Sequence, residues 1–139
     1  MMGRLEHYGI WTARLLIALV FLLNATGVID QSKPAQEMAE RGIPPSIIPF
    51  LMWCGRALEL VAGLALLVGY QQRLAALALI LFLVPATLIA HSFWLFPEPD
   101  RQLQIFNFTK NLAMIGGLLF IAIVPHYLIV RLVQSLTTA

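Results

Sequence analysis

The stretch RALELVAGLALLVGYQQR, from Arg56 to Arg73, decides the fold class of this chain. It is strongly apolar, yet Arg56 and Glu59 stand about one helical turn apart within it. Gly55, Glu59 and Gly63 follow at intervals of four residues, so the three share one face of a helix. An apolar helix that gathers charge and small residues on one face is typical of a packed membrane span.

The composition of the whole chain agrees with this interpretation. Its 139 residues are 60% hydrophobic and 12% charged, with a mean hydropathy of +0.83, whereas soluble domains carry about 25% charged residues. A transmembrane helix needs about 20 mostly apolar residues. The sequence therefore predicts an all-α, integral membrane four-helix bundle in a single domain, 1–139. The predicted spans are 10–29, 47–68, 74–96 and 105–124.

The segments outside the spans are short. Lys33-Pro34 opens a polar stretch that Gly42 and the following prolines end, which predicts a short extramembrane helix between spans one and two. Residues 125–139 begin at a proline and are expected to form either a kinked continuation of span four or an interfacial helix. Four spans place both termini on one side. A slight excess of Lys and Arg on that side favours the cytoplasm.

Several functions are excluded by what the sequence lacks. The net charge is only +2 and forms no basic run, which argues against nucleic acid. The single cysteine, Cys54, allows neither an internal disulfide nor a CxxC pair. No phosphate loop, dinucleotide fingerprint or nucleophilic serine motif is present. The three histidines lie on different segments, so we predict no metal site and no intrinsic cofactor.

Ionisable residues inside membrane spans are costly and by default mark a site. We therefore expect the polar residues of the spans to face the bundle, and we hypothesise that they bind a ligand: Arg14, Arg56, Glu59, His91, Asn107 and Lys110. Depth along the spans predicts that Arg14 approaches Glu59. The alternative is that this pair only fixes helix register. Small residues predict close helix packing at Gly55, Gly63, Ala113 and Gly117.

Short motifs in a fixed order make the chain resemble the DoxX family of small bacterial inner-membrane proteins. The matching pieces are Arg14, the Gly27 region, Gly42-Ile-Pro, ELVAG at 59–63, LVG at 67–69 with Arg73, His91-Ser, and KNLAMIGG at 110–117. The resemblance implies a four-helix bundle in the inner membrane, with Arg14, Glu59, His91 and Lys110 at recurrent polar positions. Many relatives carry a lysine where this chain reads Gly27-Val-Ile-Asp, and Arg56 is not part of the family pattern.

Some members of the DoxX family are associated with thiosulfate:quinone oxidoreductases or oxidant-defence complexes. The resemblance thus implies a quinone- or lipid-headgroup-binding subunit, more an accessory subunit than a catalyst, with membrane lipid and a soluble or membrane redox protein as partners. One alternative is a structural or assembly protein without ligand chemistry. Another is a small transporter or proton path, which would require a homo-oligomer. Ligand, partner and oligomeric state stay open at this stage.

Overall fold

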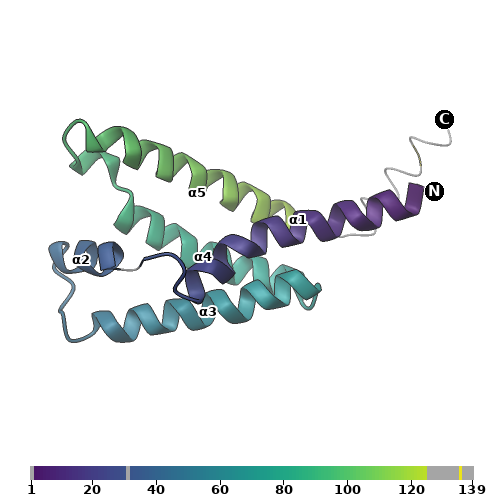
Figure 1. The fold of residues 1–139 in the computed structure, drawn as a ribbon, viewed down its shortest axis with the longest axis horizontal. Helices are drawn as coiled ribbons and strands as arrows, with labels where there is room; N and C mark the ends of the chain where they lie inside the picture. Colours follow the sequence, from purple (N-terminus) through teal and green to yellow (C-terminus); the bar gives the residue numbers. More distant parts are fainter. Residues whose placement is uncertain (1, 31, 125–134, 136–139) are drawn as a thin grey trace.

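The computed structural model describes residues 2–30, 32–124 and 135. Within these residues the chain is helical, with four long helices: α1 (Met2–Ala25), α3 (Ile48–Val68), α4 (Gln72–Ala90) and α5 (Asp100–Ile123). Each contains a stretch long and apolar enough to cross a membrane. Successive long helices run in opposite directions, with α3 packed between α1 and α4, and α4 packed against α5 (Figure 1). The predicted all-α bundle with four spans is confirmed.

The turn between α3 and α4 is tight because Gly69 ends α3 in the left-handed conformation, at φ +82°. The Gly69 N–H donates to the Leu66 carbonyl at 3.3 Å, and the Tyr70 N–H donates to the Ala65 carbonyl at 2.8 Å. This pair of bonds is the Schellman motif, which closes a helix at a glycine. Since α4 starts at Gln72, the two helices become antiparallel neighbours over three linking residues.

The polar segment forms the short helix α2 (Ser32–Glu40), as the sequence predicts. The Asp30 carboxylate accepts hydrogen bonds from the Ser32 backbone N–H at 3.0 Å and from the Ser32 hydroxyl at 2.7 Å. After α2, Gly42 adopts φ +80° and its N–H donates to the Ala39 carbonyl. The helix α2 contacts α3 and α4 and lies at the end of the bundle opposite the start of α1 (Figure 1).

The last two spans differ in detail from the predicted ranges. The helix α4 continues through Pro85 but ends at Ala90, where the Ser92 hydroxyl donates to the Leu88 carbonyl. A single 3₁₀ turn, η1 (Phe93–Leu95), follows. The helix α5 begins at Asp100, earlier than predicted, because an acidic residue in the first turn suits a helix N-terminus. The prediction for 125–139 lies outside the described residues, apart from Ser135 in a helical conformation.

The core is small and the apolar surface is large. Phe21, Leu66, Leu79 and Leu118 are fully buried among alanines of the neighbouring helices. Large apolar side chains nevertheless point outward, with Leu81 74% and Trp53 71% exposed. A water-soluble monomer rarely exposes apolar patches of this extent. The outward surface is therefore suited to contact with lipid.

Candidate functional site

The most buried charged side chain among the described residues is Glu59, which is 3% exposed. The Asn24 amide, near the end of α1, donates to both Glu59 carboxylate oxygens at 2.7 Å. Arg56 lies one turn earlier on α3, and its Nε is buried without a hydrogen-bond partner. The Asn24–Glu59 contact joins α1 to α3 near the middle of the α3 span.

Arg14, on α1, does not lie beside Glu59 but beside the C-terminal end of α3. An added Cβ at Gly69 would come within 2.6 Å of Arg14 Nη1, so the guanidinium rests directly on this turn. The guanidinium carbon also lies 5.9 Å from the centre of the Trp11 ring, one turn earlier on α1. Gly69 is ten residues beyond Glu59, which is about 15 Å of helix. The predicted approach of Arg14 to Glu59 is therefore wrong.

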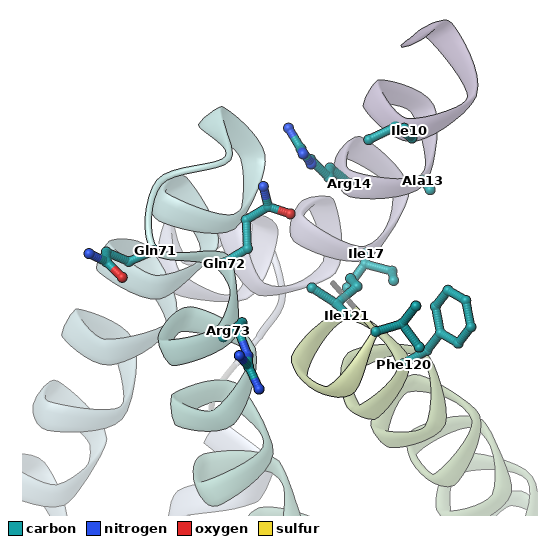
Figure 2. Close-up of a pocket in the computed structure, with 11 residues that line it drawn as sticks. Ile10, Ala13, Arg14, Ile17, Gln71, Gln72, Arg73, Phe120 and Ile121 are labelled. Carbon is teal, nitrogen blue, oxygen red and sulfur yellow. The ribbon is translucent and has the colours of Figure 1, made fainter. Parts of the chain in front are cut away.

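A cavity of about 550 Å³ opens beside Arg14, between α1, the α3–α4 turn and the end of α5 (Figure 2). Its polar lining consists of Arg14, Gln71, Gln72 and Arg73. The rest is Gly117 and apolar side chains: Ile10, Ala13, Ile17, Phe120, Ile121 and Val124. The volume falls in the range of small-molecule sites, about 300–1,000 Å³. A mostly apolar wall with polar groups at one side suits an amphiphilic ligand.

Arg73 is held in place from α5. Its Nε donates to the Ala122 carbonyl at 2.9 Å, one of the carbonyls that the end of a helix leaves without an intrahelical partner. The side chain of Gln72 donates to the Gly69 carbonyl at 3.2 Å. Figure 2 shows Arg14 and Gln72 close together, with the Arg73 side chain pointing in a different direction from that of Arg14. The polar side of the cavity is thus assembled from three separate parts of the bundle.

The remaining predicted ligand residues lie at the end of α4 and in the first half of α5. His91 Nδ1 lies 2.8 Å from Gln104 Oε1, which ties the end of α4 to α5. Lys110 is exposed and donates to Asn107 Oδ1 at 3.2 Å. The six residues thus fall into three groups: Arg14 at the cavity, Arg56 and Glu59 in the middle of α3, and the other three at the end of α4 and in the first half of α5.

A second small cavity, of about 190 Å³, lies under α2 and is lined by Glu37, Glu40, Arg41, Leu95 and Phe96. Burial raises the pKa of the Glu37 carboxyl above its usual value, while the charges of His91 and Arg41 act in the opposite direction. The contact therefore places a partly buried carboxyl between α2 and the end of α4.

Three of the four residues predicted to pack helices lie against a neighbouring helix. An added Cβ would meet Phe82 at Gly55, Leu22 at Gly63 and Ile17 at Gly117. Ala113 is exposed.

Sequence reasoning missed two polar residues that join the helices. Asn24 links α1 to Glu59 of α3, and Gln104 links α5 to His91 at the end of α4. The Thr87 hydroxyl also links two helices: it donates to the Leu83 carbonyl at 2.6 Å and accepts from Asn111 Nδ2 at 3.0 Å. A polar side chain within an apolar span is the signal that could have found Asn24, because such groups require a partner.

Four apolar helices with buried polar links define a small multi-pass membrane protein. The DoxX family model matches residues 9–92, and the chain belongs to this family. The inner membrane protein YqjF of Escherichia coli (strain K12) is 32% identical over 123 residues, which cover 88% of each chain. No solved structure matches. The chain is accordingly a multi-pass inner membrane protein, and the family match includes Arg14, Glu59 and Arg73.

Proposed function

We propose that this protein binds the polar headgroup of a lipophilic molecule, a quinone or a lipid, in the cavity between α1, the α3–α4 turn and α5. The observation that carries the proposal is the two-sided lining of that cavity, with arginines and glutamines on one side and apolar side chains on the other. Such a lining would orient an amphiphile by its head while its apolar part stays in contact with hydrocarbon.

The position of the cavity along the bundle supports the same function. The polar residues belong to the α3–α4 turn and to α1 beside it, and span ends lie near the headgroup region of a bilayer. Long arginine side chains reach this region from within a span. A lipophile could enter from the membrane without crossing an aqueous phase.

A role within an oxidoreductase or an oxidant-defence complex is part of this proposal and needs a second protein. The sequence carries no recognisable redox cofactor motif, so electrons for a bound quinone would come from a partner. The chain would then act as an accessory subunit that holds the lipophilic reactant in the membrane.

The test is to fill the cavity without changing its charge. Full-length protein is purified in a mild detergent, and co-purifying quinones and lipids are extracted and identified by mass spectrometry. We expect Ala13→Phe, which places a ring in the cavity, to lose a lipophile that the wild type retains. Leu16→Phe adds the same ring on the exposed side of α1 and should retain it. Identical lipophile content in the three proteins would contradict the proposal.

A structural role is the second candidate, and the hydrogen bonds of Glu59 favour it for that residue. A buried carboxylate with both oxygens on one amide is a contact between helices rather than an open site. On this account Glu59→Gln changes the thermal stability of the bundle but leaves the retained lipophiles unchanged. Loss of a specific lipophile in Glu59→Gln, with stability unaffected, would instead move the binding site to Glu59.

A further inference from the structure

The charge of the cavity lining is one-sided. Among the described residues that line it, the charged ones are Arg14 and Arg73, from different helices, and none is acidic. Both side chains therefore give the polar side of the cavity a positive charge that no lining carboxylate compensates. A ligand with negative charge compensates these charges, whereas a neutral quinone leaves both uncompensated.

Both arginines also have N–H groups that form no hydrogen bond among the described residues. Arg14 Nε is buried and has no hydrogen-bond partner. The only side-chain hydrogen bond of Arg73 found within the described part of the chain runs from Nε to the Ala122 carbonyl, so its two terminal nitrogens are left for other acceptors. A buried donor without a partner is unfavourable. The terminal nitrogens of both side chains suit phosphate oxygens, because guanidinium pairs with phosphate through two parallel hydrogen bonds.

The guanidinium of Arg14 is positioned before any ligand arrives. On one side lies the Gly69 turn, where the lack of a side chain permits the close approach. On the other lies the face of Trp11, at a distance typical of a cation–π contact. A long side chain fixed in this way loses less conformational entropy when it binds.

The apolar part of the lining can contact the hydrocarbon tail of a ligand whose charged head lies at the arginines. Ile17 of α1 and Phe120 and Ile121 of α5 continue the cavity away from the arginines. Gly117 lies against Ile17, where an added Cβ would come within 3.3 Å of its Cδ1. A volume of about 550 Å³ holds a headgroup and the first part of one chain, with the rest of the molecule in the bilayer.

We propose that the cavity binds an anionic phospholipid, with its phosphate on the polar side that Arg14 and Arg73 line and one acyl chain between α1 and α5. This inference rests on the proposed function and commits it to one ligand class. The membrane itself supplies the ligand. A phospholipid and free inorganic phosphate share the phosphate group, but only the phospholipid also contacts the apolar wall of the cavity.

The test uses full-length protein in a neutral detergent and native mass spectrometry with four probes: phosphatidylglycerol, phosphatidylcholine, inorganic phosphate and a ubiquinone. We expect phosphatidylglycerol to bind about 25-fold more tightly than phosphatidylcholine, since two arginines near a membrane surface each favour an anionic lipid by about fivefold. Inorganic phosphate should bind weakly, because it lacks the chain.

The arginine variants locate the preference. Arg14→Gln and Arg73→Gln should each weaken phosphatidylglycerol binding by about fivefold and leave phosphatidylcholine binding unchanged. Arg101→Gln is the matched control for Arg73→Gln, because Arg101 also donates from Nε to a backbone carbonyl, that of Phe93, at the other end of the bundle. It should bind as the wild type does. Thermal unfolding of each variant shows whether it is folded. If Arg14→Gln is not folded, Arg14→Lys replaces it in the test. It should keep the preference for phosphatidylglycerol.

Two outcomes overturn the inference. One is equal affinity for the two phospholipids, and the other is a preference that survives both glutamine variants. If ubiquinone binds instead and Ala13→Phe excludes it, the proposed function stands and only the lipid assignment fails. If Ala13→Phe changes the binding of no probe, the proposed function fails as well. Tight binding of inorganic phosphate alone would identify a soluble anion as the ligand and also overturn the lipid assignment.

Discussion

Gly69 meets two requirements at one position. Its φ of +82° favours glycine, and its missing side chain makes room for Arg14. We therefore expect Gly69→Ala to destabilise the protein in two ways. The left-handed conformation costs about 1–2 kcal/mol for a residue with a Cβ, and the displaced guanidinium adds to this cost. The measurement is the free energy of unfolding in a mild detergent.

Gly27 supplies the control for this prediction. It ends α1 with the same pair of hydrogen bonds and nearly the same φ, +80°, yet an added Cβ there would meet nothing within 4 Å. Gly27→Ala should therefore show only the backbone cost. In an Arg14→Ala background, the cost of Gly69→Ala should fall to that of Gly27→Ala. Equal costs in the wild-type background would mean that Arg14 does not rest on this turn.

The wrong partner assigned to Arg14 has a physical explanation. The position of a residue along a span can be estimated from sequence, but the offset between two antiparallel helices cannot. In the structure Asn24 faces Glu59, so moving ten residues back along α1 to Arg14 leads ten residues forward along α3 to Gly69. Helical side chains also point toward the N-terminus, which carries the Arg14 guanidinium away from the bilayer centre. Sequence identified Glu59 as buried but not the amide that binds it.

The short helix α2 makes a pH-dependent contact with the bundle. Burial raises the pKa of Glu37, with a smaller contribution in the same direction from Glu40, while His91, Arg41 and Lys33 lower it. A carboxyl whose pKa is raised by folding stabilises the folded state when protonated. This contribution is present below the usual value of 4.5 and is lost as the pH rises through the raised value. Docking of α2 should therefore weaken over that interval.

Glu37→Gln tests this contact because it fixes a neutral side chain of similar shape. Above the raised pKa we expect the variant to be more stable than the wild type, and its stability should change less between the usual and the raised value. Glu40→Gln removes an exposed carboxylate from the same helix and should keep most of the wild-type dependence on pH. Thermal unfolding in detergent at a series of pH values measures both. A wild-type profile in Glu37→Gln would contradict the assignment.

At the level of helices, sequence predicted more than it did at the level of contacts. Apolar length alone located the four spans, and the proline and glycine around α2 located that helix. The ends of α4 and α5 were less predictable, because Phe93–Leu95 is apolar enough to extend a span but folds as a separate turn. The cavity was not predictable, since it depends on how far α1 and α5 diverge beside the α3–α4 turn. Composition carries no information on that divergence.

The whole molecule has two ends of unlike composition, and this difference predicts its orientation in the membrane. One end carries the cavity with Arg14 and Arg73, and the other carries α2 with most of the acidic residues of the loops. The positive-inside rule counts Lys and Arg rather than acids and favours the first end in the cytoplasm. The cytoplasmic leaflet also has the negative surface potential that the proposed lipid site would exploit. We therefore expect Gln71 to face the cytoplasm and Gln102 to face the other side.

Cysteine labelling in intact cells separates the two orientations. Cys54 is first replaced by alanine, and Gln71→Cys or Gln102→Cys then places a single thiol in an exposed position at one end or the other. A maleimide that cannot cross the inner membrane should label the second variant in intact cells and the first only after lysis. The reverse pattern would place the arginine cavity in the outer leaflet. The phospholipid proposal would survive that result, because its chemistry requires an anionic headgroup at Arg14 and Arg73 but not a particular leaflet.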